Sequence, residues 1–378
     1  MIMINLMVIK MRKFKNKTKK SKIIPILAII LMLINVCCLT IVYSALSSTL
    51  NISGEVSIVL PNNYYYRNNR FYTDPTNNDL IVTDNSNEVK TLEVMTNNIC
   101  KQYSILYFQN CYEVSSEEQI TAHTNILIKR YTDEKNPTNN YIGDLILING
   151  SGSLTLSGSE NNKITINGGY NGNTTINGYG INLNQGKLTL KDNIKITNCL
   201  GTSGKNGGAI YANIKESNDF KLIGTNAPII IDNNYSSGNE GAGIYTENTT
   251  GNKLQIPISG EIKINNNYLI SNPKDPDYFP YEINATNNLK KSNLYLGKGL
   301  TFRISDKLKN SKIGIRSLGW GGGWWWNSNI SGYNCRNYIA SATISNLDLN
   351  SIFNVDIAKK KTVAYSTSKD IYMCILSN

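Results

Sequence analysis

A repeat with a period of 30 to 35 residues is the feature that most restricts the fold of this chain. Similar segments follow one another at this spacing: KITIN at 163–167, IKITN at 194–198, IIIDN at 229–233 and IKINN at 262–266. Between them lie GYGI at 178–181, GGAI at 207–210 and GAGI at 241–244. A fixed period with self-similar units indicates a solenoid, in which each unit packs on its neighbours.

Each unit contains short β-branched triplets such as Ile164-Thr165-Ile166, with the alternation of a strand that buries one face. Strands of this length are too short for a free-standing sheet. Stacked in parallel on copies one period away, they complete their hydrogen bonds and form apolar columns, in which each buried side chain contributes roughly 1.5–3 kcal/mol. We therefore predict an all-β fold, with a right-handed parallel β-helix (solenoid) over 145–305.

Glycine and asparagine recur at the corners of the expected coils. Glycine permits a positive φ at a tight turn, which we expect at Gly207-Gly208, Gly241 and Gly243. Asparagine side chains can stack into a ladder whose amides bond from coil to coil. The asparagines that follow the triplets are the expected members of that ladder: Asn167, Asn198, Asn233 and Asn266.

These motifs resemble a known group. GGAI at 207–210 and the segments Ile231-Asp232-Asn233-Asn234 and Ile264-Asn265-Asn266-Asn267, with Ile where the group has Phe, look like the polymorphic outer-membrane protein repeat. More broadly, the region 150–305 is similar to bacterial right-handed parallel β-helix surface proteins and adhesins. The resemblance implies a surface location and adhesion, and it brings no catalytic residues to this chain.

The N-terminal region has the pattern of a membrane-targeting segment. Eight of the 38 basic residues precede Ile23, and no acidic residue precedes Glu55. Residues 23–42 carry no charge, a length that can cross a hydrocarbon core of about 30 Å as a helix. Basic flanks stay cytoplasmic, so the remainder is expected outside. Tyr43–Gly54 resembles surface proteins of Gram-positive-type bacteria. An uncleaved membrane anchor and a cleaved signal peptide both stay open, as does a start at Met1 or Met11.

The net charge of +11 is therefore a targeting signal. Outside the first 22 residues, 30 basic residues nearly balance 27 acidic ones, which is no footprint for a nucleic acid. The domain order that we expect is a basic cytoplasmic segment at 1–22, a transmembrane or signal helix at 23–43, a linker at 44–60, a β-rich N-terminal cap at 61–144, the β-helix at 145–305 and a C-terminal β cap at 306–378.

Within the N-terminal cap, we expect Glu117–Arg130 to form a short helix over the open end of the solenoid. Tyr64-Tyr65-Tyr66 lies beside Arg67 and Arg70. These residues could bind a glycan or a peptide, and a strand with one exposed aromatic face is the alternative. Such caps are needed because a terminal coil exposes both its core and its strand edges.

Two aromatic segments are candidates for ligand binding. All four tryptophans of the chain lie in the loop LGWGGGWWWNSN at 318–329: Trp320, Trp324, Trp325 and Trp326. Left exposed together, they would exceed the roughly 300–600 Å² of an ordinary apolar surface patch, so the loop either packs on the solenoid end or stacks on a sugar. The second candidate is a proline-rich loop that carries Tyr278, Phe279 and Tyr281.

Cysteine and histidine content restricts the remaining chemistry. Cys100 and Cys111 are close enough in sequence to form a disulfide across a hairpin, and buried thiols are the alternative. His123 is the only histidine, and no cysteine pair has metal-ligand spacing with it. We expect neither a metal nor a cofactor.

Three function classes remain. Glycosidic hydrolysis needs two carboxyls about 5–10 Å apart, and Asp192 and Asp232 stand at different offsets from their strands without a partnering acid. The chain is therefore not expected to be an enzyme, although a polysaccharide lyase or hydrolase is one reading of a β-helix. The pattern favours a cell-surface protein, or a secreted one if the signal is cleaved, with adhesin-like binding of a glycan or protein ligand. A purely structural surface component is the alternative.

Overall fold

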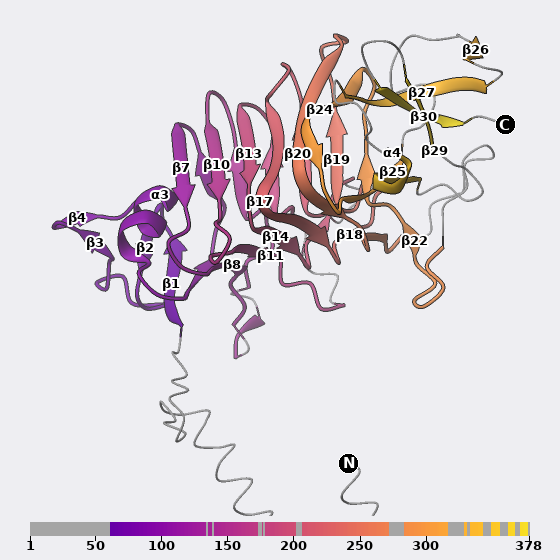
Figure 1. Cartoon of the computed structure of the whole chain (residues 1–378). Helices are drawn as coiled ribbons and strands as arrows, with labels where there is room; N and C mark the ends of the chain where they lie inside the picture. The colour runs from indigo at the N-terminus through magenta and orange to yellow at the C-terminus, as the bar shows by residue number, and fades with distance from the viewer. Residues whose placement is uncertain are drawn as a thin grey trace, which may run out of the picture. The chain divides into compact units, whose positions relative to one another are not determined.

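A computed structural model describes the following residues: 61–133, 135–137, 140–172, 176, 178–201, 206–271, 283–316, 329–330, 333–342, 349–355, 362–366 and 371–376. Strands dominate this part of the chain and lie in one long, mostly parallel sheet system (Figure 1). The expected all-β architecture is confirmed, and the pairing is that of a solenoid.

The strands form three parallel stacks, which we call stacks A, B and C. Stack A contains β7 (Glu117–Thr121), β10 (Ser153–Ser157), β13 (Lys187–Lys191), the first parts of β17 (Phe220–Asp232) and β20 (Leu254–Ile264), β24 (Leu300–Leu308) and β27 (Tyr333–Ala342). Stack B contains β1 (Asn62–Arg67), β5 (Ser104–Phe108), β8 (Ile126–Arg130), β11 (Ile164–Asn167), β14 (Ile194–Thr197), the second parts of β17 and β20, β25 (Lys312–Arg316) and β28 (Phe353–Val355). Stack C contains β6 (Tyr112–Val114), β9 (Ile146–Ile148), β12 (Ile181–Leu183), β16 (Ile210–Asn213), β19 (Ile244–Glu247) and β23 (Leu294–Tyr295).

Shorter elements complete the fold. A small sheet at the corner between stacks B and C holds β15 (Leu200–Gly201), β18 (Tyr235–Ser236), β21 (Tyr268–Leu269) and the antiparallel β22 (Lys290–Lys291). The N-terminal end carries β2 (Arg70–Tyr72), β3 (Thr83–Asp84), β4 (Asn87–Glu88), helix α3 (Leu92–Val94) and the π-helical turn η1 (Met95–Ile99). The C-terminal end carries β26 (Asn329–Ile330), helix α4 (Leu349–Ile352), β29 (Thr362–Ser366) and β30 (Ile371–Leu376).

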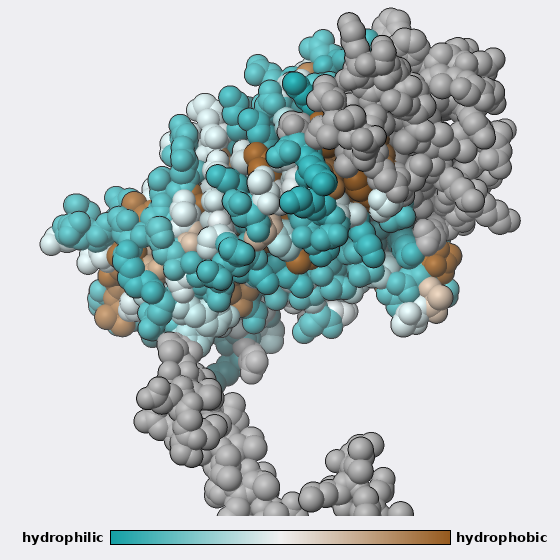
Figure 2. All heavy atoms as spheres, viewed as in Figure 1, coloured by the Kyte–Doolittle hydropathy of each residue, from teal (hydrophilic) through white to brown (hydrophobic). Residues whose placement is uncertain are grey.

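Like residues stack on like because the register repeats from coil to coil. In stack B, Ile166 pairs with Ile128 on one side and with Ile196 on the other. In stack A, Leu156 pairs with Leu190. All five side chains are at most 1% exposed, so each stack adds a continuous apolar column to one core. The surface is mostly hydrophilic in the view of Figure 2, as expected when strands alternate between core and solvent.

The solenoid extends beyond the expected limits of 145 and 305. On the N-terminal side, β1 already pairs in parallel with β5, and β5 with β8. On the C-terminal side, β27 and β28 continue the parallel pairing of β24 and β25 before β30 pairs antiparallel with β27. The early coils lack the Gly and Asn motifs of the later ones, which is why the repeat did not mark them.

The expected helix at Glu117–Arg130 is wrong. These residues form strands β7 and β8, in which buried and more exposed positions alternate. Glu118, Ile120, Ile126 and Ile128 point inward with at most 4% exposure. A period of two suits a strand, and coils on the next turn supply backbone partners for both segments, which overrides their local preference for helix.

The N-terminal end of stack A is instead covered by α3 and η1. The side chain of Asn97 in η1 accepts a hydrogen bond from the Thr121 backbone at 3.0 Å and donates to the Gln119 carbonyl at 2.9 Å. One amide side chain thus replaces part of the missing neighbouring strand. Glu118 accepts hydrogen bonds from the Tyr112 hydroxyl and from the Glu93 backbone at the start of α3.

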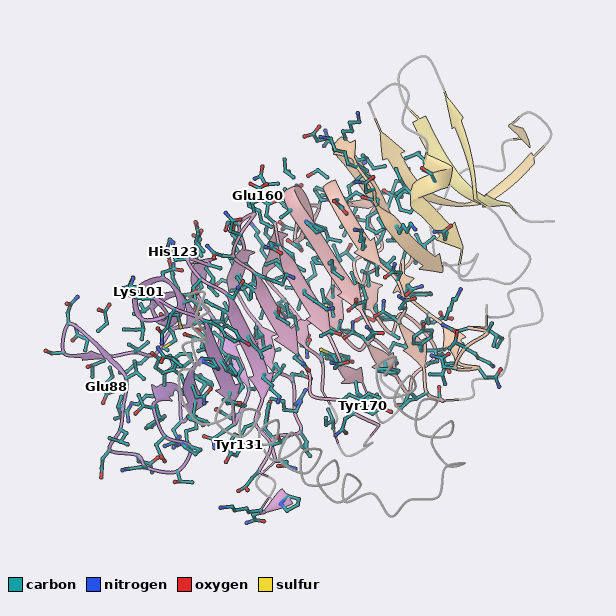
Figure 3. The ribbon with its side chains drawn as sticks, turned by 60° about the horizontal axis from the view of Figure 1, so that its bottom comes forward. Glu88, Lys101, His123, Tyr131, Glu160 and Tyr170 are labelled. Atoms are coloured by element: carbon teal, nitrogen blue, oxygen red, sulfur yellow. The ribbon has the colours of Figure 1, made fainter. Side chains whose placement is uncertain are left out.

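Two corners of the solenoid can be followed in Figure 3. His123 and Glu160 lie in turns that lead from stack A to stack B, on one side of the molecule. Tyr131 and Tyr170 follow strands of stack B, and they lie on the other side. We call the second side the B–C corner, because the chain passes there from stack B to stack C.

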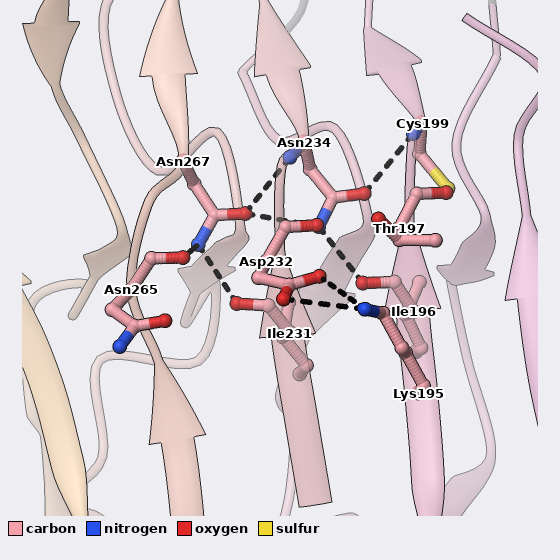
Figure 4. Close-up of polar contacts among 9 residues, drawn as sticks. All are labelled: Lys195, Ile196, Thr197, Cys199, Ile231, Asp232, Asn234, Asn265 and Asn267. Atoms are coloured by element: carbon pink, nitrogen blue, oxygen red, sulfur yellow. Dashed lines mark hydrogen bonds and ion pairs between the residues drawn. The ribbon is translucent and has the colours of Figure 1, made fainter. Parts of the chain in front are cut away.

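The asparagine ladder exists, but it is built one residue later than predicted (Figure 4). Asn198, Asn233 and Asn266 have φ values of 53°, 54° and 54°. Asparagine tolerates this left-handed backbone better than most residues, so these positions form the turn. The next residue then points inward. Asn234 donates to Asn267 at 2.9 Å, and Asn267 donates to Asn293 at 3.0 Å.

The predicted ladder member Asn167 has a different role, since its side chain accepts a hydrogen bond from the Gly169 backbone at 2.9 Å. The glycine prediction is confirmed for Gly207 and Gly241, whose φ values are 84° and 62°. Gly208 and Gly243 are instead needed for close approach of neighbouring backbone. Among the described residues, no helix has the length and apolarity to cross a membrane. The predicted helix at 23–43 lies outside these residues.

Candidate functional site

The predicted ligand-binding residues lie outside the part of the chain that the structure describes. This holds for Trp320, Trp324, Trp325 and Trp326 and for Tyr278, Phe279 and Tyr281. Their part in binding stays a prediction. The described strands on either side of the second segment, β21 and β22, pair antiparallel with each other at the B–C corner.

The predicted disulfide between Cys100 and Cys111 is not formed in the structure, where Cys100, Cys111 and Cys199 are free thiols. The first two lie in different environments. Cys100 follows η1 and is fully buried in the core, whereas Cys111 lies near Tyr141. Burial raises the pKa of the Cys100 and Cys111 thiols to about 11. Such thiols are poor nucleophiles at neutral pH.

The Tyr64-Tyr65-Tyr66 segment is divided between the inside and the outside of the solenoid. Tyr64 and Tyr66 pack on the core, and Tyr65 lies half-buried on the outer face. Arg67 donates to the carbonyls of Asp74 and Asn77, each at 2.8 Å, and thereby holds the following loop. Arg70 forms an ion pair with Glu88 at 2.8 Å. The two arginines therefore stabilise the N-terminal end, and only Tyr65 is presented outward.

Tyr65 belongs to a cluster of three outward tyrosines. Its ring stacks on that of Tyr107 with centroids 5.2 Å apart, and Tyr131 meets both rings at a steep angle. The Lys129 ammonium lies 5.9 Å from the centre of the Tyr107 ring, within cation–π range. The cluster follows from register, because Tyr65 pairs with Tyr107, and Tyr107 with Lys129.

A longer aromatic row lies along stack C, and we call it the tyrosine ladder: Tyr179, Tyr211, Tyr245 and Tyr295. Successive ring centroids are 5.4, 6.0 and 5.0 Å apart, and successive planes differ by 18°, 13° and 9°. Tyr211, Tyr245 and Tyr295 occupy one register position in β16, β19 and β23. Tyr179 precedes β12 and adds the fourth ring.

Ladder formation has a local cause in the backbone. Gly207 lets the chain pass close beneath the rings, and Gly208 lets it pass close to the backbone of the next coil. A Cβ atom on Gly207 would lie 3.3 Å from the Cβ of Tyr245 and 3.4 Å from the Tyr179 ring. A Cβ atom on Gly208 would overlap the Tyr235 carbonyl oxygen. The first glycine of the GGAI motif thus allows close packing beneath the aromatic row, and the second allows close packing against the backbone at Tyr235 and Ala242.

Polar groups hold the edges of the ladder rings. The Tyr211 hydroxyl donates to a carboxylate oxygen of Glu247. Burial, followed by the bond to Glu247, raises the pKa of Tyr211 above its usual value. Burial likewise raises the pKa of Tyr245, against a smaller opposite effect of a hydrogen bond with Asn206. These two hydroxyls therefore stay protonated over the physiological range. The Tyr211 hydroxyl gives its proton to Glu247 and can accept a further hydrogen bond.

A second row follows stack B at the B–C corner, and we call its members the corner tyrosines: Tyr170, Tyr235 and Tyr268. Centroids of Tyr170 and Tyr235 are 4.8 Å apart, and those of Tyr235 and Tyr268 are 6.2 Å apart. These rings are tilted by 54° and 39° and do not form a face-to-face ladder. Tyr170 and Tyr235 are half-buried, whereas Tyr268 is 5% exposed.

Asp192 and Asp232, the acidic residues considered for catalysis from the sequence, both have structural partners. Asp192, 2% exposed, accepts hydrogen bonds from the Asn226 backbone at 2.8 Å and from the Asn226 side chain at 3.1 Å. Asp232 forms an ion pair with Lys195 at 3.3 Å (Figure 4). In the described part of the chain, no group of three or more His, Cys, Asp or Glu side chains could hold a metal ion. The Asp192 contacts fix a turn, and the Asp232 ion pair joins neighbouring strands of stack B.

A shallow groove of about 440 Å³ lies where the bulges of β17 and β20 stack beside β24. Its charged lining residues are Glu261, Asp306, Lys307 and Lys309. Both signs are present, and Glu261 pairs with Lys263. The groove therefore selects neither an anion nor a cation.

Comparison with protein-family models, with curated proteins and with solved structures finds no match to this chain.

Most members of the tyrosine rows are predictable from the sequence. Tyr211 and Tyr245 directly follow the GGAI and GAGI motifs, and Tyr295 follows Leu294 in the equivalent place. Tyr235 and Tyr268 each follow a pair of asparagines. A tyrosine at a constant offset from a repeated motif predicts a row of tyrosines on successive coils. The tryptophans are rare in the chain, but they do not recur with the repeat.

Proposed function

We propose that this protein is a right-handed parallel β-helix of the bacterial cell surface, exported or anchored through residues 23–43. Its function is adhesin-like binding of a glycan or protein ligand on the outer face of the solenoid. The tyrosine ladder supports this proposal best, because it places a row of aromatic rings on an outer face where a purely hydrophilic scaffold would not need them. Three of the four, Tyr211, Tyr245 and Tyr295, are half-buried and remain partly accessible.

Several physical features favour binding over catalysis. Tyrosine offers a large, rigid contact area and a polar hydroxyl at low cost in conformational entropy. The hydroxyls of the ladder stand beside Glu247 and Asn206, which supply an acceptor and an amide. Asp192 and Asp232, the acids considered for catalysis, are engaged by Asn226 and Lys195. We therefore propose no catalytic step.

A purely structural surface component is the second candidate. One observation favours it: the ladder rings stack on each other with plane angles of 9–18°, so their faces are used within the protein. Stacked aromatic pairs contribute about 0.5–1.5 kcal/mol beyond the area that they bury. On this reading, the ladder stabilises the coils and meets no ligand.

A pair of variants separates the two candidates. The full chain, purified in detergent, is applied to a glycan array and to bacterial and animal cells. Tyr211→Phe and Tyr245→Phe keep the stacked rings and remove the hydroxyls. We expect the double variant to keep its melting temperature within a few degrees and to lose most of its binding. Binding that is unchanged in this variant, together with a large loss of stability in Tyr245→Ala, would leave only the structural role.

The location is tested separately. Protease added to intact cells should digest the chain after residue 43, while a cytosolic marker stays intact. Protection equal to that of the marker would contradict the predicted topology.

A further inference from the structure

We infer that the tyrosine ladder binds an extended, neutral polysaccharide whose chain runs along the stacking direction of the coils. This inference rests on the proposed binding function and names the ligand class for it. The contact is with the interior of a polymer, one sugar unit against each coil, and not with the terminal sugar of a branched glycan.

The first argument is periodicity. Neighbouring coils present the same group at ring-centroid distances of 5.0–6.0 Å, close to the roughly 4.7–4.9 Å that separates paired strands. A ligand gains equivalent contacts on each coil only if it repeats at a similar length. An extended polysaccharide advances by about one coil per sugar, so successive units meet successive tyrosines. A globular protein surface has no such repeat.

The second argument is the orientation of the rings. Because the ladder rings stack along the solenoid, their faces meet one another, and the partly exposed rings of Tyr211, Tyr245 and Tyr295 present their edges outward. A single sugar that stacks on an exposed aromatic face finds no such face between the rings. A row of hydroxyls at regular spacing suits the hydroxyl groups along a polymer, each of which can donate and accept.

The third argument is the charge beside the ladder. A parallel row of outward polar residues flanks it on stack C: Asn149, Asn184, Asn213 and Glu247. Asn213 and Glu247 are paired in register, and Asn184 donates to Asn149 at 3.2 Å. The two rows hold one carboxylate, Glu247, and no basic residue, and two further carboxylates, Asp144 and Glu240, lie within electrostatic reach of Tyr179 and Tyr245. A polyanion needs cationic partners, so this face favours uncharged sugars that bond to amides and hydroxyls.

The test is a length series with a defined probe. Neutral β-1,4-linked glucose oligomers, and separately N-acetylglucosamine oligomers, from the disaccharide to the hexasaccharide are titrated calorimetrically into the full chain in detergent. We expect the affinity to rise by about tenfold or more, equal to about 1.4 kcal/mol, from disaccharide to trisaccharide, and then to level off. The plateau falls there because Tyr211, Tyr245 and Tyr295 are partly exposed, whereas Tyr179 is only 6% exposed. Sulfated oligomers of equal length should bind more weakly.

Substitutions of single tyrosines test whether the tyrosine ladder is the binding site. Tyr245→Phe should lower the affinity for the tetrasaccharide by about fivefold while the melting temperature holds, and Tyr245→Ala should remove the length dependence. The matched control is Tyr235→Phe among the corner tyrosines, which should leave the affinity unchanged. Because the Phe variants keep the packing, they decide the question even if the Ala variant unfolds.

Three outcomes would overturn the inference: an affinity that does not depend on length, tighter binding of the sulfated series, or an equal effect of Tyr235→Phe. An absence of binding to every oligomer would overturn it as well. In that last case, the cell-binding and array experiment shows separately whether the proposed function survives with a protein or branched-glycan ligand.

Discussion

The side-chain amide of Asn234 donates a hydrogen bond to the side-chain oxygen of Asn267 over 2.9 Å, which joins two consecutive coils inside the solenoid. The same Asn267 oxygen accepts from the Asn234 backbone at 3.1 Å, and the Asn267 amide continues to Asn293 at 3.0 Å. Both asparagines are 0% exposed. Their polar groups are satisfied by each other, which is the condition for burying an amide without loss of stability.

Asn267→Ala should therefore cost about 3 kcal/mol in the free energy of unfolding. The substitution leaves the backbone N–H of Asn234 without its acceptor, and a buried group so orphaned costs about 1–3 kcal/mol. It also removes one of two donors to the Ile231 carbonyl, which keeps the Asn265 backbone N–H. Urea unfolding of the full chain measures the change in the free energy of unfolding. The control is Asn265→Ala, two residues earlier and half-buried, which should stay within about 0.5 kcal/mol. Equal losses at the two positions would show that the ladder has no special role.

Gly208→Ala should cost about 2–3 kcal/mol, because the added Cβ would overlap the Tyr235 carbonyl oxygen and lie 2.5 Å from that of Ala242. Gly251→Ala is the comparison. Nothing lies within 4 Å of a Cβ there, so only its φ of 75° opposes the substitution, at about 1–2 kcal/mol. Thermal unfolding ranks the two. If Gly251→Ala proved the more damaging, backbone conformation and not close packing would govern the motif.

Arg130→Met should destabilise the protein by about 2–4 kcal/mol. The guanidinium is 0% exposed and donates to the carbonyls of Gly168 at 2.8 Å, of Gly178 at 3.4 Å and of Gly143. Removing the buried charge recovers some desolvation energy, but three carbonyls lose a donor, and that loss is larger. Lys129→Met, on the outer face of the same strand, is the control and should change the free energy of unfolding by less than about 1 kcal/mol.

A pH dependence follows from Glu118, which is 4% exposed. Burial raises its pKa above the ordinary value of 4.5, against hydrogen bonds from Tyr112 and the Glu93 backbone. A raised pKa means that the folded state holds the proton more tightly than the unfolded state. The contribution of Glu118 to stability should therefore fall as the pH rises from about 4.5 through the folded-state pKa.

The measurement compares the parent with Glu118→Gln, which keeps an acceptor for Tyr112 and cannot ionise. The difference in the free energy of unfolding between the two proteins should shift in favour of the Gln variant across that interval. A difference that is flat with pH would show that Glu118 has the same pKa in both states.

The thiols give a further prediction. Burial raises the pKa of Cys199 to about 12, against a smaller opposite effect of Arg130. In the folded protein, Cys100, Cys111 and Cys199 should resist a thiol-alkylating reagent at neutral pH and react after denaturation, as read by peptide mass spectrometry. A linked peptide pair that joins Cys100 and Cys111 under non-reducing conditions would instead restore the predicted disulfide.

The candidate site shows how far the residues alone could lead. Repetition predicted stacked coils, and the tyrosine at a fixed offset from GGAI and GAGI was visible in the same lines of sequence. The sequence did not show which tyrosines form one row, because Tyr179 joins the ladder from a position before its strand and outside the register. The candidates chosen for rarity, such as Trp325, lie outside the described residues and stay predictions.

The sequence by itself determined the period, the strands of the later coils and the turn glycines Gly207 and Gly241, because local pattern and composition carry that information. Only the tertiary structure decided what depends on neighbours one coil away. Glu117–Arg130 became strands because β10 and β11 supply their partners. The amide ladder moved to Asn234 and Asn267 because the preceding asparagine takes the left-handed turn and turns the next side chain inward. Backbone hydrogen bonds between coils fix both outcomes, and no single repeat contains them.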